Sequence, residues 1–556
     1  MTPAGTPEAN GPVTDRPDPA TPATPAAPVT PGTQVGRFCR SGWRLATGLA
    51  SVALGTSQVR PAPGDWRFKD PAWAQHPYYR RLGQAYSVSC AFADEVLDDL
   101  ARTGRSVSAA RFVVNVAESA AAPTNMLLGN PAAVKRAYET GGLSLLRGTR
   151  NLLDDVVHNG AMPSTVDRSA YQVGRDFAIT PGTVVDRDPY AELIQYTPST
   201  ERVQARPFLI IPPPIGRYYF LDLRPGRSMV EYTVSRGLQA FMLSWRNPTR
   251  EQAGWNLDTY AGRVLSAIEA VREITGAPDI DVIGFCAGGI LLTLALNHLA
   301  ALGEKPVHSA SYAVTLLDWG AEVPIKAFSA SKLLALARWN SARAGVISAR
   351  DMGSAFTWMR PDDLVWKAWV NNYLMGDKPP AFDILAWNAD GTNLPAGLHA
   401  QFLDLFEHNP MATPGALTCL GTPVDLSTIT MPTYVTGGVT DHLTPWTSCY
   451  RTTQLLGGPS TFVLSNAGHI QSLVNPPGNP KATFYTGPEL PEDPQAWLAA
   501  AEQHTGTWWT HWADWVIAHS GKTKAAPGQP GSAGHPPLDD APGRYVRDLG
   551  PADVRS

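Results

Sequence analysis

The sequence predicts an α/β fold in which a parallel sheet carries a reactive cysteine. From about residue 190, short β-branched segments alternate with helical ones, which is typical of a parallel sheet covered by helices on both faces. One such segment, 280–285, runs directly into Cys286. Two later segments are followed by an aspartate and a histidine, Asp441 and His469. These three side chains are the candidates for the chemistry.

Two regions precede this alternation. Residues 1–60 form a Pro-, Ala- and Thr-rich tail with its lead-in, and the first 35 residues have almost no large apolar side chains, so we expect a disordered tail. Residues 61–189 are mainly helical by their periodicity, as at Val96, Leu97 and Leu100, which share one face. The α/β domain covers 190–556 and ends in a Pro- and Gly-rich tail over 523–542 that we expect to be flexible.

The polar candidates follow the ends of predicted strands. Six strands are expected, at 208–211, 240–243, 281–285, 313–317, 434–436 and 462–464. Ligand sites in parallel sheets lie beyond the carboxyl ends of the strands, and Cys286, Asp441 and His469 all fall there. A helical, aromatic-rich stretch at about 320–400 interrupts the alternation, as a cap inserted over the site would. Ordinary helix packing accounts for most of its aromatic rings.

Composition excludes several classes of function. In 556 residues, 17% are charged and the formal net charge is −4, so no basic excess indicates nucleic acid or an anionic membrane. The longest apolar run, 290–302, is broken by Asn297 and His298 and is too short to cross a bilayer. An odd number of cysteines without metal-like spacing indicates a reducing cytoplasm rather than a disulfide framework or a metal site; they are Cys39, Cys90, Cys286, Cys419 and Cys449.

The segment 284–288, Gly-Phe-Cys-Ala-Gly, is a nucleophile elbow pattern with cysteine in the place of the usual serine. The chain turns sharply from strand to helix in such an elbow, so side chains at Gly284 or Gly288 would clash. A thiol at the N-terminus of the following helix would be favoured as the thiolate by the helix dipole. A buried small thiol on a tight turn would explain the pentapeptide alone equally well.

The chain order of nucleophile, acid and histidine is that of the α/β-hydrolase fold. In this arrangement His469 takes the proton of the Cys286 thiol, and Asp441 fixes the tautomer of the imidazole and stabilises the imidazolium. His442, beside Asp441, is a candidate second base or orienting residue.

An oxyanion hole requires two backbone N–H groups. We expect one from Ala287, which follows the nucleophile, and the other from Ile215, because the three prolines before it, at 212–214, have no N–H to donate. A simple proline turn that ends the strand is the alternative explanation of these prolines.

With these motifs the chain resembles the polyhydroxyalkanoate synthases from about Trp66 to Val546. The segments that carry the resemblance are 212–223, 244–248, 284–288, 387–395, 421–426, 440–446 and 468–477. The resemblance implies a cofactor-independent acyltransferase that joins (R)-3-hydroxyacyl units from coenzyme A thioesters into a polyester on cytoplasmic granules. It also implies Cys286, Asp441 and His469 as the catalytic residues, with Asp222 and His442 as supporting ones.

Further details resemble the single-subunit, medium-chain-length (class II) type, which implies a homodimer without a second kind of subunit. They are Met352 and the segments 358–361, 370–373, 448–450 and 469–472. The chain departs from the family at Pro214, at Gly216 and Arg217, where the family often has Asn-Lys, and at Ala287, where the medium-chain type usually has serine. These departures concern the oxyanion loop and the elbow, and therefore the side-chain preference rather than the triad.

Two alternative functions remain at this point. One is a cysteine-dependent thioester hydrolase or polyester depolymerase on the same fold, and the other is a non-catalytic protein of the granule surface. The complete set of Cys286, Asp441 and His469 argues against the latter. Release of coenzyme A together with polymer, rather than with free hydroxy acid, would separate the synthase from the hydrolase.

Overall fold

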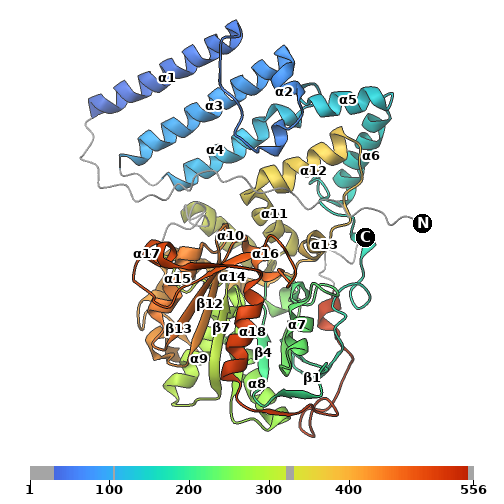
Figure 1. The fold of residues 1–556 in the computed structure, drawn as a ribbon, viewed down its shortest axis with the longest axis vertical. Helices are drawn as coiled ribbons and strands as arrows, with labels where there is room; N and C mark the ends of the chain where they lie inside the picture. Colours follow the sequence, from blue (N-terminus) through green and yellow to red (C-terminus); the bar gives the residue numbers. More distant parts are fainter. Residues whose placement is uncertain (1–30, 104–106, 321–330, 549–556) are drawn as a thin grey trace. The chain divides into compact units, whose positions relative to one another are not determined.

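A computed structural model describes residues 31–103, 107–320 and 331–548 of the chain. The described residues form two compact units (Figure 1). The first combines residues up to Thr165 with Phe356–Pro380, and the second combines Val166–Ala355 with the chain from Ala381 onward. Within the described residues, no helix is both long and apolar enough to cross a membrane.

The first unit is helical, as the periodicity predicts. Its helices are α1 (Pro31–Leu54), α2 (Ala72–Gln75), α3 (Pro77–Ala101), α4 (Ser108–Ala121), α5 (Pro131–Glu139), α6 (Leu143–His158) and α12 (Lys367–Trp369). The predicted tail and lead-in over 1–60 therefore differ from the structure at 31–54, which form α1. This helix packs against α3, since a Cβ at Gly48 would lie 2.9 Å from Val88. The remainder of the predicted disordered tail, 1–30, lies outside the described residues.

The predicted cap at about 320–400 is divided between the two units. Its central part, 356–380, packs with α6 of the first unit: Tyr373 donates a hydrogen bond to buried Asp155 (2.7 Å), and Asn151 donates to the carbonyl of Asn372 (3.0 Å). Polar side chains of α6 thus hold this segment in the first unit. The flanking helices stay in the second unit; they are α10 (Ser331–Ala344), most of α11 (Ala349–Met359), α13 (Asp383–Ala389) and α14 (Ala396–His408). Residues 321–330 lie outside the described residues.

The second unit is built on a ten-stranded sheet in the order β1-β2-β5-β4-β6-β7-β12-β13-β14-β15. The six central strands are parallel: β5 (Ala240–Trp245), β4 (Phe208–Ile211), β6 (Ile280–Phe285), β7 (Val307–Ala313), β12 (Thr433–Gly438) and β13 (Ser460–Ser465). Antiparallel strands flank them on both edges: β1 (Gly182–Arg187) and β2 (Ala191–Tyr196), and β14 (Thr483–Thr486) and β15 (Glu502–Thr505).

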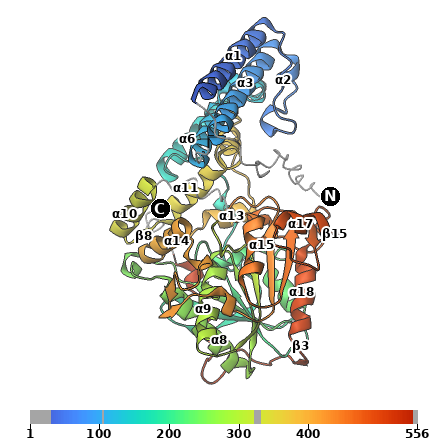
Figure 2. The same ribbon diagram turned by 90° about the vertical axis from the view of Figure 1, so that its left-hand side faces the viewer.

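Helices cover both faces of the sheet, which is why the parallel strands are buried along almost their whole length. Figure 2 shows α8 (Leu257–Thr275), α9 (Ala287–Ala301) and α15 (Trp446–Leu455) on one side and α18 (Trp508–His519) on the other. The alternation of side chains along β4 follows this division. Phe208 and Ile210 join one apolar core with Trp508 and Trp512 of α18, whereas the intervening Leu209 points to the opposite face.

One predicted strand is wrong. The segment at 313–317 was expected to be extended, but β7 ends at Ala313 because Val314 adopts a φ of 45°. The amide of Val314 donates to the carbonyl of Thr436 (2.9 Å), and the Thr315 hydroxyl donates to the carbonyl of Cys286 (3.1 Å). The residues beyond β7 thus leave the strand direction and brace the cysteine.

The Pro- and Gly-rich segment 523–542, expected to be flexible, is held against the sheet. Its first residues form β16 (Thr523–Ala525), which pairs with β3 (Arg202–Gln204). Farther along, the carbonyl of Asp539 accepts a hydrogen bond from the amide of Val184 (2.8 Å), and Gly531 donates to Gln195 (2.7 Å). Groups of β1, β2 and β3 thus supply hydrogen-bond partners along this segment.

Candidate active site

Cys286 occupies a strained turn between β6 and α9, with φ 50° and ψ −123°. Such a conformation is costly for a residue with a side chain and is found where it orients a functional group. Two close approaches require the glycines of the elbow. A Cβ at Gly284 would lie 2.5 Å from the Cα of Gly289, and a Cβ at Gly288 would lie 2.3 Å from the carbonyl oxygen of Ile211. The Cys286 side chain is half-buried.

Asp441 and His469 meet beyond the ends of β12 and β13, two strands that are neighbours in the sheet. The Asp441 Oδ2 lies 2.7 Å from the Nδ1 of His469, and both residues are buried. The other carboxylate oxygen of Asp441 accepts hydrogen bonds from the amides of Leu443 (2.8 Å) and Thr444 (2.9 Å). Because Nδ1 is engaged by the carboxylate, Nε2 is the ring nitrogen available to the thiol.

Electrostatics couple all three residues. Burial lowers the pKa of His469, but the charge of Asp441 and hydrogen bonds with Asp441 and the Cys286 sulfur outweigh burial and raise this pKa to about 10. Burial by itself raises the pKa of Asp441. The charge and the hydrogen bond of His469 act in the opposite direction and outweigh burial, so that this pKa lies below its usual value. The pair therefore favours an imidazolium beside a carboxylate, and an imidazolium can stabilise an adjacent thiolate.

Replacing Asp441 with asparagine is expected to lower the pKa of His469 markedly. The raised pKa means that the folded protein binds this proton more tightly than the unfolded chain. Its contribution to stability is complete below about 6.5 and is lost as the pH rises through about 10. Urea unfolding across this range should show the wild type losing its advantage over Asp441→Asn toward high pH. A constant difference between the two proteins would contradict the coupling.

The residues expected to form the oxyanion hole lie near the cysteine and near its neighbouring strand. Ala287 is the first residue of α9, and the first amides of a helix have no acceptor within it. Ile215 lies in the loop after β4 and is half-buried. The close approach of Gly288 to the carbonyls of Ile211 and Pro212 brings the beginning of this loop against the elbow. The roles of both amides remain predictions.

The two residues predicted to support the site have different surroundings. Asp222 is fully buried and accepts hydrogen bonds from the hydroxyls of Thr180 (2.5 Å) and Ser228 (2.8 Å), and burial raises its pKa. Ser228 caps α7 (Met229–Ser235), so these contacts hold the start of that helix. His442 is half-buried in the turn between Asp441 and Thr444. A supporting role for either residue in the chemistry remains a prediction.

The sequence reasoning missed Thr444. Its hydroxyl donates to the Oδ2 of Asp441 (2.6 Å) and lies 3.1 Å from the Nδ1 of His469. Asp441 accepts hydrogen bonds from two amides and this hydroxyl, all supplied by the two residues that follow His442, so the turn itself orients the carboxylate. The signal was available in the sequence as Asp-x-x-Thr, a spacing at which side chains hydrogen-bond locally.

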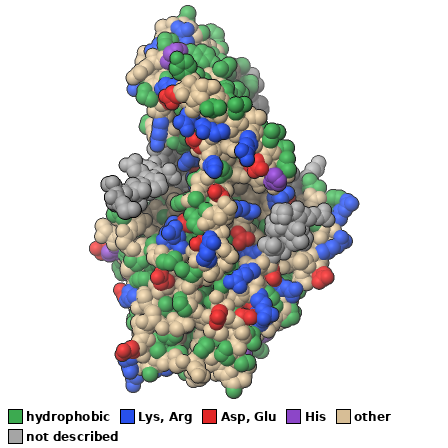
Figure 3. All heavy atoms as spheres, turned by 90° about the vertical axis from the view of Figure 1, so that its right-hand side faces the viewer, with side chains coloured by type: hydrophobic (Ala, Val, Ile, Leu, Met, Phe, Trp, Pro, Cys, Tyr) green, Lys and Arg blue, Asp and Glu red, His purple; other side chains and the backbone are tan. Residues whose placement is uncertain are grey.

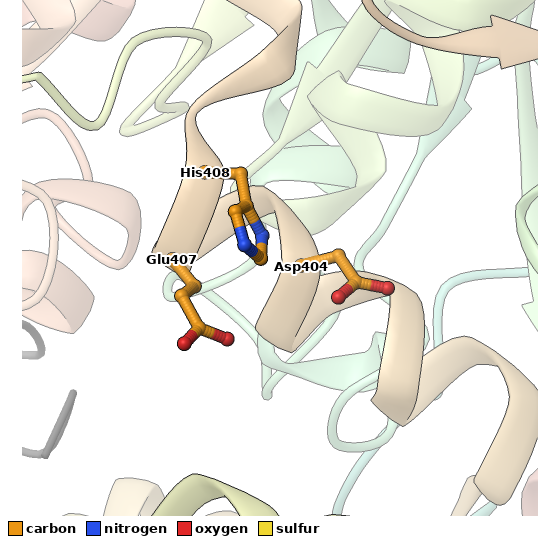
Figure 4. A group of neighbouring side chains, drawn as sticks. All are labelled: Asp404, Glu407 and His408. Carbon is orange, nitrogen blue, oxygen red and sulfur yellow. The ribbon is translucent and has the colours of Figure 1, made fainter. Parts of the chain in front are cut away.

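A second group of titratable side chains lies on α14. Asp404, Glu407 and His408 are close enough together to hold a metal ion (Figure 4). Arg338 of α10 occupies this group, however, with nitrogens 2.7 Å from Asp404 and 3.0 Å from Glu407. Since the guanidinium already compensates both carboxylates, we attribute this group to helix packing.

Comparisons with known proteins place the chain in a family. A model described as the N-terminus of poly-beta-hydroxybutyrate polymerase (PhaC) matches residues 64–233, and one described as the alpha/beta hydrolase fold matches residues 225–476. Poly(3-hydroxyalkanoate) polymerase 1 of Ectopseudomonas oleovorans is 45% identical over 503 residues, which cover 90% of this chain and 89% of that protein. This chain belongs to the poly(3-hydroxyalkanoate) polymerase family.

A second relative agrees with this membership. The poly(3-hydroxyalkanoate) polymerase subunit PhaC of Cupriavidus necator is 38% identical, with coverage of 89% of this chain and 85% of that one. Among solved structures, the monoacylglycerol lipase of Paleococcus ferrophilus covers 59% of this chain and 99% of its own at 12% identity and a TM-score of 0.32. The resemblance to the synthases and the predicted α/β-hydrolase fold are both confirmed, and the family is one of acyltransferases.

Proposed function

We propose that this protein polymerises (R)-3-hydroxyacyl-CoA into a polyester and releases coenzyme A, through an acyl group held on Cys286. The observation that carries the proposal is the strained elbow that presents Cys286 to His469, whose Nδ1 is held 2.7 Å from Asp441. The relatives named poly(3-hydroxyalkanoate) polymerase support the same reaction class.

In the acylation step, the sulfur of Cys286 attacks the thioester carbonyl, and the carbonyl oxygen takes up the negative charge. The amides of Ala287 and Ile215 are the proposed donors to this oxygen. When the carbon–sulfur bond to coenzyme A breaks, the His469 imidazolium gives its proton to the leaving thiolate. One thioester replaces another, so the acyl group stays reactive.

In the elongation step, neutral His469 takes the proton of the 3-hydroxyl on the next unit. The resulting oxygen attacks the acyl group on Cys286, an ester bond forms, and the cysteine sulfur leaves and regains the imidazolium as its partner. Asp441 stabilises the imidazolium formed in this step. The extended chain, still a coenzyme A thioester, then acylates Cys286 again, so each added unit releases one coenzyme A, and no oxidant or reductant is needed.

A hydrolase would use water in place of the 3-hydroxyl, so the products distinguish the two functions. We expect purified protein supplied with 3-hydroxyacyl-CoA to release thiol and to form polymer. Following thiol with a disulfide reagent and the product by chromatography tests this expectation. Stoichiometric free hydroxy acid without polymer would establish the hydrolase instead.

We propose that acyl groups of medium length are preferred or at least accepted. The support is the set of class II resemblances at Met352, 358–361, 370–373 and 448–472, together with the 45% identity to the Ectopseudomonas oleovorans polymerase. The expected result is turnover of eight- and ten-carbon substrates at rates comparable to or above the four-carbon one, measured as thiol release. Turnover of the four-carbon substrate alone would contradict it.

We further propose that the protein acts as a homodimer on cytoplasmic polyester granules. Large apolar side chains on α1 support contact with an apolar surface: Phe38, Trp43 and Leu54 are 60%, 71% and 77% exposed. Figure 3 shows hydrophobic atoms spread among basic ones on the surface of the helical unit.

Two measurements test this proposal. Analytical sedimentation should show dimers, and polymer particles should retain the wild type more strongly than Trp43→Gln. A strict monomer with full activity would overturn the dimer.

A further inference from the structure

Arg217 is a buried arginine that the proposed chemistry does not use. It lies two residues after Ile215, at the end of the loop that follows β4, and it is 3% exposed. Its guanidinium donates hydrogen bonds to the main-chain carbonyls of Tyr545 (3.1 Å) and Asp548. Its Nε lies 3.5 Å from the carboxylate of Asp390. A buried charge is retained only where its partners compensate its desolvation, so these carbonyls are part of its site.

The carbonyls belong to the C-terminal strap, which we define as residues 538–548. The strap is anchored independently of Arg217. The amides of Arg544 (3.0 Å) and Tyr545 (3.0 Å) donate to the carboxylate of Glu192, which is fully buried in β2. The Tyr545 hydroxyl donates to the carbonyl of Asp188 (2.7 Å). The strap therefore presents its carbonyls to Arg217 from a fixed position on the sheet edge.

The opposite side of the loop is also held. The amide of Gly216 donates to the Thr392 hydroxyl (2.8 Å), which in turn donates to the carbonyl of Pro214 (3.1 Å). The indole of Trp387 donates to the carbonyl of Arg217 (2.7 Å). The residues on either side of Ile215 are thus held from two directions. Side chains of 387–392 hydrogen-bond to the main chain of the loop, and the strap hydrogen-bonds to the Arg217 side chain.

We infer that Arg217 is a positioning residue, through which the C-terminal strap holds the 212–217 loop in the geometry that the Ile215 amide needs as an oxyanion donor. This inference rests on the proposed function. Gly216 has a φ of 83°, a region open to glycine but costly for other residues, so the loop can change direction there once a restraint is lost. Oxyanion donors act only within a narrow distance range, and a displacement of about 1 Å suffices to weaken them.

The test separates acylation, which uses the oxyanion hole, from alkylation, which does not. Full-length wild type, Arg217→Met and Arg217→Lys are compared in three measurements. The first is the acylation rate of Cys286 by an acyl-CoA that lacks the 3-hydroxyl, followed as a burst of thiol. The second is the rate of Cys286 alkylation by iodoacetamide, read by mass spectrometry of the Cys286 peptide. The third is the thermal unfolding midpoint.

Arg206→Met is the matched control. Arg206 is a partly buried arginine of the second unit that, like Arg217, lies near a carboxylate, Asp279, and donates to a main-chain carbonyl, that of His519. It precedes β4, whereas Arg217 follows it, so its loss removes comparable contacts at the end of the strand away from the loop.

Arg217→Met is expected to slow acylation by roughly 10- to 100-fold, approaching the effect of losing one oxyanion donor, while alkylation changes by less than about 2-fold. The acylation rate of Arg217→Lys should lie between those of the wild type and Arg217→Met, because an ammonium group keeps the charge but lacks the planar fork that reaches two carbonyls. Arg206→Met should lower the unfolding midpoint without changing the ratio of acylation to alkylation. If Arg217→Met does not fold, the ratio of acylation to alkylation measured on Arg217→Lys tests the inference instead.

A wild-type ratio in both Arg217 variants would overturn the inference, as would an equal loss of ratio in Arg206→Met. A parallel fall of acylation and alkylation in the Arg217 variants would show a general structural role and would also overturn it. Acylation of the wild type tests the proposed function separately. If the wild type is not acylated, both the proposed function and the inference are overturned. If the wild type is acylated and the Arg217 variants are acylated at the same rate, only the inference is overturned.

Discussion

Replacing Cys286 with alanine is expected to abolish polymer formation and coenzyme A release while leaving the fold intact. The substitution removes only the sulfur from a half-buried side chain, and alanine can keep the backbone position at little additional cost. His469 and Asp441 would remain paired, because their 2.7 Å contact does not involve the sulfur. Thiol release, product analysis and the thermal unfolding midpoint provide the three measurements.

Cys286→Ser is the informative companion variant. Its hydroxyl is a far weaker nucleophile at neutral pH and forms a less reactive oxygen ester, so we expect severe impairment rather than restoration. Mass spectrometry of wild type incubated with an acyl-CoA that lacks the 3-hydroxyl should locate the adduct on Cys286. Polymer from Cys286→Ala at the wild-type rate, or an adduct on Cys39, Cys90, Cys419 or Cys449 instead, would show the assignment to be wrong.

Gly288→Ala is expected to impair both stability and activity strongly, although it leaves every proposed catalytic side chain in place. The added Cβ would lie 2.3 Å from the carbonyl oxygen of Ile211 and 2.7 Å from that of Pro212, and both neighbours are backbone atoms that cannot rotate away. We expect a loss in the free energy of unfolding of about 3 kcal/mol. Because relief of the clash separates the elbow from the loop that carries Ile215, thiol release should fall far more than stability alone explains.

Gly262→Ala is the control for this prediction. Gly262 also lies in a helix, α8, but a Cβ there would meet only a Leu420 methyl at 3.7 Å, an ordinary contact. This variant should be as stable as wild type or slightly more stable, since alanine restricts the unfolded chain. Urea unfolding and thiol release measured on the pair test the expectation. If Gly288→Ala behaved like Gly262→Ala in both measurements, the close approach would have no functional importance.

Sequence reasoning was accurate where the signal is local. The continuous apolar segment at 208–211 is β4 in the structure, and the glycines around Cys286 are required by contacts within the elbow and with β4. Chain order also placed Asp441 and His469 after strands that prove to be neighbours. Such features depend on side-chain volume, backbone freedom and the period of a strand, which a few consecutive residues express by themselves.

Sequence reasoning failed where the structure of a segment depends on partners far away in the chain. The strand expected at 313–317 ends at Ala313, because Val314 and Thr315 hydrogen-bond to Thr436 and Cys286. The predicted cap is divided because its central part finds polar partners on α6. In each case the sequence contains the donors and acceptors, but not the information about which of them meet.

The sequence by itself therefore determined the fold class, the cysteine elbow and the family. Only the tertiary structure decided that Thr315 braces Cys286 and that the C-terminal strap reaches the loop beside the elbow. The physical reason is the range of the interactions. Apolar periodicity and glycine spacing act along the local chain, whereas buried Glu192 and Arg217 acquire partners more than 300 positions away only when folding has removed water from between them.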